Sequence, residues 1–274
     1  MLELLKAVLF GIVEGVTEWL PISSTGHLIL LNQLVALNVS DQFRSMFDVV
    51  IQLGAILAVV VLFFHKLNPF APSKTPAQKQ GTWQLWFHVI AAISPSGVVG
   101  VLLDDWMDAH LHNSTVVAIA LIAYGIAFIL VERNNRGKQP AVDRVDAIDY
   151  KTALLIGAFQ CLSLVPGTSR SGSTILGGIL LGVSRGAAAE FSFFMAIPTM
   201  LGASAIKLLK FFLSGVGFAG SEAAVLLVGC VVSFLVSLVV IKGLMEYVRR
   251  HSFSAFGVYR IVLGVIVLLF FAFT

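Results

Sequence analysis

Charged residues are scarce in this chain. Only 12% of its 274 residues are Asp, Glu, Lys or Arg, about half the share of an ordinary soluble domain. Hydrophobic residues make up 58%, and the mean hydropathy is +0.93. This composition excludes soluble globular and disordered classes, because several apolar stretches reach the length that a bilayer core requires. We therefore predict an all-α, polytopic membrane protein that has bilayer lipids as partners.

Cysteine is nearly absent as well. Cys161 and Cys230 both lie in apolar surroundings, and no CxxC spacing is present. This excludes a disulfide framework and a cysteine metal site. The net charge of +3 is small, and the basic residues fall in loops between apolar segments. That distribution is typical of membrane topology, and it excludes nucleic acid as a partner.

The apolar residues form eight blocks, four on each side of a polar linker at residues 133–151. We expect a first repeat at 1–132, with a broken block at 4–37 and transmembrane spans at 47–64, 85–103 and 115–131. The second repeat, 152–274, has a broken block at 153–183 and spans at 187–212, 223–245 and 256–273. The linker is expected on the cytoplasmic side.

The first block of each half is interrupted by small polar residues. The first interruption reads Leu20-Pro21-Ile22-Ser23-Ser24-Thr25-Gly26-His27, and the second reads Val165-Pro166-Gly167-Thr168-Ser169-Arg170-Ser171-Gly172-Ser173-Thr174. Broken helices at membrane depth are tolerated where they line a cavity or are buried in protein. We expect two re-entrant helical hairpins. Because a hairpin adds no crossing and each half has three spans, the halves are expected to be inverted-topology repeats.

The distribution of Lys and Arg predicts the orientation. In this topology four of them lie on one side: Lys6, Arg44, Lys207 and Lys210. Twelve lie on the other: Lys66, Lys74, Lys79, Arg133, Arg136, Lys138, Arg144, Lys151, Arg185, Lys242, Arg249 and Arg250. The positive-inside rule makes the second side cytoplasmic. Both termini are then outside, the first hairpin opens outward, and Arg170 and Arg260 are embedded in the membrane.

Two carboxylates precede the first interruption. Glu14 and Glu18 are four residues apart and share a helix face. Each charge at a bilayer centre costs at least about 2.5 kcal/mol, so two like charges need a compensating cation. A divalent ion such as Mg²⁺ or Ca²⁺ suits paired carboxylates, which makes both glutamates candidate metal ligands. The alternative is an ion pair with Arg170 or Arg260.

The residues after Pro21 suit an anion. Ser23, Ser24, Thr25 and Gly26 are small and open a helix, whose free N–H groups attract phosphate. A plain helix cap is the alternative. His27 follows closely, and we expect it to be catalytic, either as a general base to a serine nucleophile or as the nucleophile itself.

The second interruption carries one charge, Arg170, whose planar guanidinium binds phosphate bidentately. Its small and hydroxyl neighbours are further candidate substrate-binding residues: Thr168, Ser169, Ser171, Gly172, Ser173 and Thr174. The two interruptions together predict a diphosphate pocket. Asp48, Gln52, Glu190 and Arg260 are weaker candidates, with supporting and helix-end positions equally weighted.

The segments Glu14–His27 and Pro166–Thr174 closely resemble the bacitracin-resistance family of undecaprenyl-diphosphate phosphatases. Residues 47–54 and 190–193 resemble it too, so the similarity covers essentially the whole chain. The type 2 phosphatidic-acid phosphatases act on the same lipid, but their second motif needs a histidine six residues after its arginine. This chain has Leu176 there, so that family is excluded.

The resemblance implies metal-dependent hydrolysis of undecaprenyl diphosphate to undecaprenyl phosphate, with Glu14, Glu18, Ser24, His27 and Arg170 in the active site. It implies a bacterial inner membrane, a site that faces outward, and a role in carrier-lipid recycling and bacitracin resistance. The partner is then a polyprenyl diphosphate lipid, with a homodimer left open. Because inverted repeats are also a transporter plan, the alternative function is a flippase of the carrier lipid, alone or beside the phosphatase activity.

Overall fold

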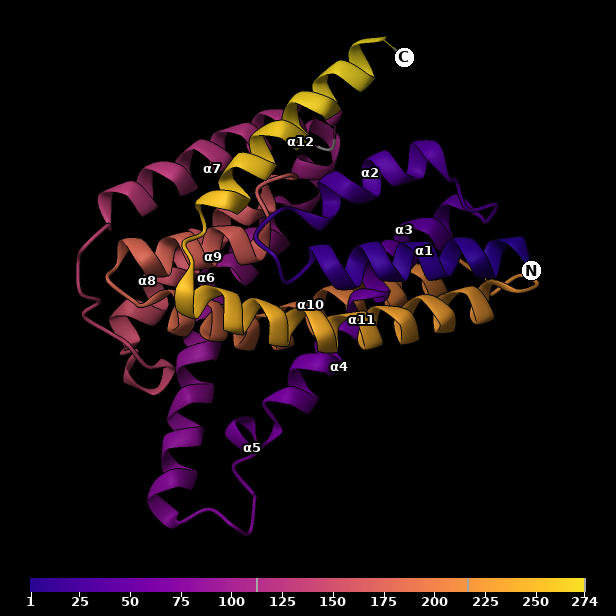
Figure 1. Ribbon diagram of the computed structural model, residues 1–274. Helices are drawn as coiled ribbons and strands as arrows, with labels where there is room; N and C mark the ends of the chain where they lie inside the picture. The colour runs from indigo at the N-terminus through magenta and orange to yellow at the C-terminus, as the bar shows by residue number, and fades with distance from the viewer. Residues whose placement is uncertain (112, 216, 274) are drawn as a thin grey trace.

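The computed structural model describes residues 1–111, 113–215 and 217–273, with the side chains at positions 104, 105 and 108 outside that description (Figure 1). Helices account for all the regular structure of these residues apart from one isolated bridge between Val142 and Val183. The helices of the first half are α1 Leu2–Thr17, α2 Ser24–Leu34, α3 Asp41–Val50, α4 Gln52–Leu62, α5 Phe64–Leu67, α6 Pro76–Leu111 and α7 Ser114–Asn134. Those of the second half are α8 Tyr150–Cys161, α9 Arg170–Leu180, α10 Arg185–Leu213, α11 Glu222–Arg250 and α12 Ser254–Phe273, with short 3₁₀ turns at Val145–Ala147 and Leu162–Leu164.

Within the part of the chain that the structure describes, six stretches are long and apolar enough to cross a membrane: Asp41–Leu62, Pro76–Leu103, Ser114–Asn134, Arg185–Leu213, Glu222–Arg250 and Ser254–Phe273. Large apolar side chains such as Val258, Val262 and Leu269 on α12 are about half exposed. Such a face is stable against lipid rather than water. The predicted all-helical, polytopic membrane class is therefore confirmed.

The helix ends depart from the predicted apolar blocks. The span predicted at 47–64 begins earlier, at Asp41, and is divided into α3 and α4 at Ile51. Helix α6 starts at Pro76 rather than near residue 85, because its polar first turns are helical although they are not apolar. Polar caps fix other ends: Asn113 Oδ1 accepts the Val116 N–H at 2.9 Å, and Asp149 Oδ1 accepts the Thr152 N–H at 2.8 Å.

The two halves do not form separate units, because helices of one half pack between helices of the other. Helix α1 of the first half runs along α11, α8 of the second half runs along α6, and α7 pairs with α12 (Figure 1). Small residues allow these close approaches. A Cβ on Gly157 would lie 1.9 Å from the carbonyl oxygen of Ala92, and one on Gly11 would lie 2.7 Å from that of Gly229. These contacts draw both broken segments, α1–α2 and α8–α9, into the centre of the molecule.

Candidate active site

Glu14 and Glu18 are held inside the protein by the packing of α1. Glu14 is fully buried, and Glu18, which caps the helix, is 6% exposed. Gly15 lies against α11, where an added Cβ would be 2.8 Å from the carbonyl oxygen of Ser233. Because α1 approaches α11 this closely, its last turn and its carboxylates are fixed relative to the second half.

The two interruptions share a local conformation. Ser23 and Ser169 have φ of 72° and 71°, and among the described residues no other non-glycine residue has a positive φ. Each serine caps the helix that follows, with Ser23 Oγ accepting from Gly26 N–H and Ser169 Oγ from Gly172 N–H. Left-handed backbone at a non-glycine residue costs about 1–3 kcal/mol and is concentrated at functional sites. The turns aim the N-termini of α2 and α9, which attract anions.

The tips of the two segments meet through Glu18. Arg170 Nη2 donates to Glu18 Oε1 at 2.9 Å, and Ser24 Oγ donates to Glu18 Oε2 at 2.9 Å. Arg170 Nη1 also donates to the carbonyl oxygen of Ser192 at 2.7 Å. The arrangement brings a hydroxyl, a carboxylate able to accept its proton and a phosphate-binding guanidinium together. The ion pair considered for the glutamates is thus present between Glu18 and Arg170.

Arg260 holds the two loops to each other. Its side chain is completely buried, and Nη1 donates to the carbonyl oxygen of Pro21 at 3.0 Å. Nη2 donates to the carbonyl oxygens of Gly167 and Thr168, both at 2.9 Å. Its guanidinium lies 5.4 Å from the centre of the Tyr124 ring. Of the two positions weighed from the sequence, Arg260 takes the supporting one.

His27 is oriented by two partners other than Ser24. Its Nδ1 lies 2.7 Å from the carbonyl oxygen of Ser23, so Nδ1 carries the proton, because a carbonyl only accepts. In the neutral ring Nε2 then accepts from the hydroxyl of Tyr259 at 2.6 Å. In this arrangement Ser24 donates to Glu18 and not to His27, so His27 is not placed to act as the base for Ser24.

Most of the other hydroxyl residues singled out from the sequence bond to protein groups. Ser171 Oγ donates to the carbonyl oxygen of Glu18 at 3.0 Å, and Thr168 Oγ1 donates to that of Val165 at 2.7 Å. Ser173 bonds to Tyr124, and Thr174 bonds to Ser192. Thr25 is the exposed member of the set. These contacts give the second loop a rigid scaffold.

Two contributors are missing from the sequence-based set of site residues. Ser192 lies in the segment 190–193 noted for its resemblance, but nothing local pointed to its contact with Arg170. Tyr259 adjoins Arg260, and a charged residue within an apolar block is the signal that could have directed attention there.

Glu14 offers a position for a cation. Both of its carboxylate oxygens are buried without a hydrogen-bond partner among the groups that the structure describes. An unpartnered buried carboxylate is strongly unfavourable, and a divalent ion would remove that cost. The described residues contain no cluster of three or more potential ligand side chains. The pair Glu14 and Glu18 therefore fits an ion whose remaining ligands are water or substrate oxygens, as Mg²⁺ prefers.

Comparison with known proteins identifies the family. Residues 7–266 match the family model described as "Bacitracin resistance protein BacA". This chain belongs to the BacA family. The "Undecaprenyl-diphosphatase" of Limosilactobacillus fermentum is 58% identical over 272 residues, which is 99% of both chains. "Undecaprenyl-diphosphatase 1" of Clostridioides difficile is 59% identical over 271 residues, covering 99% of this chain and 97% of the relative.

A third BacA relative, the "Undecaprenyl-diphosphatase" of Streptococcus thermophilus, is 58% identical over 98% of this chain and 94% of its own. The predicted family is therefore confirmed. Because these relatives carry the name of an enzyme, the carrier-lipid transporter considered above is not favoured.

Proposed function

We propose that this protein hydrolyses undecaprenyl diphosphate to undecaprenyl phosphate and inorganic phosphate. The observation that carries the proposal is the double contact of Glu18 with Ser24 and Arg170, which joins the tips of two distant segments. The names of the BacA relatives supply the substrate. The reaction recycles the carrier lipid for peptidoglycan and other surface polymers. Abundance of the enzyme confers resistance to bacitracin.

In the proposed reaction Ser24 Oγ attacks the terminal phosphorus and passes its proton to Glu18, its hydrogen-bond partner. Undecaprenyl phosphate leaves, and water then releases phosphate from the serine. Arg170 and the free N–H groups of α2 and α9 stabilise the charge on the transferred phosphoryl group. Arg170 Nη2 would exchange its hydrogen bond to Glu18 for one to the phosphate. Its Nη1 would keep the hydrogen bond to the carbonyl oxygen of Ser192.

His27 is the alternative nucleophile. Its Nε2 is the unprotonated nitrogen and is paired with Tyr259, from which it would have to separate before it could attack phosphorus. Ser24 needs no such separation from its base, and this difference favours the serine.

We further propose that Glu14 and Glu18 hold a divalent cation, Mg²⁺ or Ca²⁺, as their chemistry and the unpartnered oxygens of Glu14 suggest. When bound, such an ion neutralises charge on the diphosphate. The remaining candidates, Thr25 and Gly26 at the start of α2, line the approach for the phosphate. The hydroxyls of Thr168, Ser171 and Ser173 bond to other parts of the protein, and that of Thr174 bonds to Ser192, which also accepts from Arg170.

The architecture that we propose is a pair of inverted repeats. Each half has three candidate spans, and α1–α2 and α8–α9 are the re-entrant hairpins. Positions 146 residues apart correspond: Ser23 with Ser169, whose φ angles agree, and Gly11 with Gly157, each against a backbone carbonyl of the other half. An odd number of crossings per half then inverts the second repeat.

For the orientation, we propose that both termini and the opening of the site lie on the outer side of the bacterial inner membrane. Figure 1 draws the two termini toward one side and the linker between α7 and α8 toward the other. Basic residues on the linker and on the neighbouring helix ends agree with a cytoplasmic position for that side. A homodimer stays a prediction that light scattering of the purified protein would test.

The test is phosphate release from a C15 or C55 prenyl diphosphate by the purified protein. We expect turnover by the wild type and a loss of at least about 100-fold in Ser24→Ala, because the attacking oxygen is removed. Ser94→Ala is the matched control, since its hydroxyl is exposed on α6 and, among the contacts of the described residues, bonds only to its own helix at Ala91. Wild-type turnover in Ser24→Ala, or no turnover by the wild type, would contradict the proposal.

A further inference from the structure

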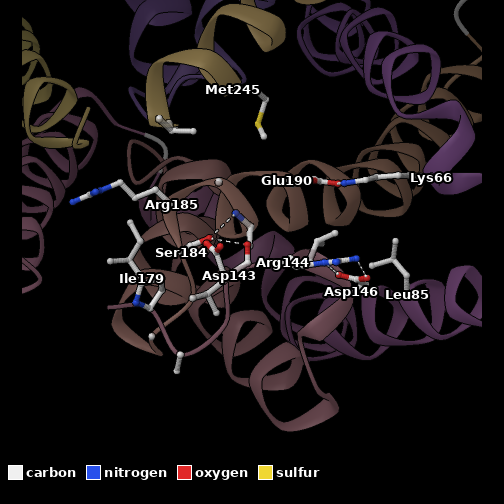
Figure 2. A pocket seen from close by; sticks show the side chains of 18 of the residues that line it. Lys66, Leu85, Asp143, Arg144, Asp146, Ile179, Ser184, Arg185, Glu190 and Met245 are labelled. Atoms are coloured by element: carbon white, nitrogen blue, oxygen red, sulfur yellow. Dashed lines mark hydrogen bonds and ion pairs between the residues drawn. The ribbon is translucent and has the colours of Figure 1, made fainter. Parts of the chain in front are cut away.

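A large cavity lies away from the Glu18–Arg170 site. Its volume is about 1240 Å³, and it is enclosed by the start of α6, the linker, the turn between α9 and α10, and the end of α11 (Figure 2). Helix α9 runs from Arg170 at the active site to Leu180 in the cavity wall, a distance of about 15 Å at 1.5 Å per residue. The cavity is therefore separate from the catalytic centre and lies on the basic side of the molecule.

Charge is concentrated in the lining. The basic members are Lys66, Lys74, Lys138, Arg144, Arg185 and Arg249, and the acidic members are Asp143, Asp146 and Glu190. Figure 2 shows Lys66 directed at Glu190 and Arg144 at Asp146, and the shortest N–O distances of these pairs are 2.5 and 2.7 Å. Behind the wall, Glu132 pairs with Arg185, and Glu246 is shared by Arg249 and Arg250.

Two lysines give the cavity a surplus of positive charge. Lys74 is 8% exposed, and its Nζ donates only to uncharged oxygens in the contacts that the structure describes, those of Lys66, Asn68 and Thr82. Lys138 lines the cavity and is exposed. The carboxylate of Asp143 offsets one of these two charges. Arg249 shares the single carboxylate of Glu246 with Arg250, so this group of three carries one excess positive charge. The net field favours an anion.

The remaining lining is apolar. Leu85, Ile179, Val183, Met245 and Val248 contribute to it, and the turn at Val183 is fixed by the bridge to Val142 of the linker. A free phosphate ion requires polar contacts on all sides. A lipid headgroup requires cations only at the phosphate and apolar surface where its chains begin. Basic pockets between transmembrane helices on the cytoplasmic side bind anionic headgroups for this reason.

We propose that this cavity binds the phosphodiester headgroup of an anionic phospholipid. Lys138 and Arg249 meet the phosphate at the opening, Lys74 adds charge from the wall, and the apolar residues receive the glycerol end of the chains. The site makes no use of the catalytic residues, so it stands independently of the phosphatase proposal.

Thermal unfolding of the full-length protein in detergent tests the site, with phosphatidylglycerol, phosphatidylcholine and inorganic phosphate as separate additions. We expect phosphatidylglycerol to raise Tm in a saturable way and the other two to have little effect. Lys138→Gln and Arg249→Gln each remove one positive charge. Each should weaken the apparent affinity for phosphatidylglycerol about fivefold, and the two together about 25-fold.

The matched control is the pair Arg136→Gln and Arg250→Gln. These residues lie close to Lys138 and Arg249 in the sequence and lose the same charge, but neither lines the cavity. Retained wild-type affinity in the control pair supports the site, whereas an equal loss in both pairs means general surface attraction and overturns it. An equal shift with phosphatidylcholine, or with inorganic phosphate, overturns the anionic-lipid assignment.

Discussion

The Glu18–Arg170 pair can be tested by a double-mutant cycle. In the double variant the contribution of the pair to stability and its contribution to catalysis are expected to change in different ways. The two charges approach to 2.9 Å, and their side chains are 7% and 10% exposed. In Glu18→Gln the guanidinium loses its only carboxylate partner among the described contacts, and in Arg170→Gln the carboxylate loses its cation. In the metal-free protein, each single change therefore leaves an uncompensated charge in a nearly buried position.

Removing one partner of a buried ion pair destabilises a protein by about 3–5 kcal/mol. At about 2–4 °C per kcal/mol for a chain of this size, Tm should fall by roughly 10 °C in each single variant. The double variant carries no charge at either position of the pair, and its glutamines can bond to each other and to Ser192. We expect most of the lost Tm to return, which requires a coupling energy larger than the loss in either single variant.

Activity should behave differently from stability. Each single variant is expected to lose about 10²–10³-fold in kcat, because one removes the acceptor for the Ser24 proton and the other removes the cation at the phosphate. The double variant should stay inactive although its Tm recovers. The assays are thermal unfolding in detergent and phosphate release from a prenyl diphosphate. Additive losses of Tm in the double variant, or activity that recovers with Tm, would refute the reasoning.

Three further predictions follow from separate contacts. Gly157→Ala should lose about 1–3 kcal/mol of stability, because its Cβ would meet the Ala92 carbonyl at 1.9 Å, whereas Gly243→Ala, with no atom within 4 Å, should lose none; equal melting temperatures would disprove the close α6–α8 contact. Tyr259→Phe should lower the free energy of unfolding by about 1 kcal/mol and leave kcat near the wild-type value, since it removes one hydrogen bond to His27, which the proposed reaction does not use; a large change of kcat would bring His27 into the reaction. A chelator should abolish phosphate release and added Mg²⁺ or Ca²⁺ should restore it, with Glu14→Gln needing more of the ion than the wild type; full activity in the chelator would remove the metal from the account.

Local patterns predicted the helical class and the approximate positions of the apolar spans, because a bilayer requires long apolar helices whatever their neighbours are. They placed the breaks correctly at Pro21 and Pro166, where small polar residues stand inside apolar blocks. They missed the polar ends of α6 and the division at Ile51, because hydropathy locates the membrane core rather than the full length of a helix. Pro95 and Pro198 lie within helices and end neither.

The residues of the candidate site could be singled out from the sequence, whereas the contacts between them could not. Buried charges are costly enough in lipid to single out Glu14, Glu18 and Arg170 from their residue types alone. The hydrogen bond from Ser24 to Glu18, rather than to His27, depends on how the last turn of α1 faces the start of α2. The contacts of Arg260 and Tyr259 span more than 230 residues of sequence, and packing alone brings them to the first loop.

The central claim is that Ser24 attacks a phosphoryl group held between the two loop tips. Acid quenching during turnover, followed by peptide mass spectrometry, would locate the phosphate on the enzyme. We predict an acid-stable phosphoserine at position 24 that disappears in Ser24→Ala. An acid-labile adduct on His27, trapped at neutral pH while Ser24 stays unmodified, would contradict the account.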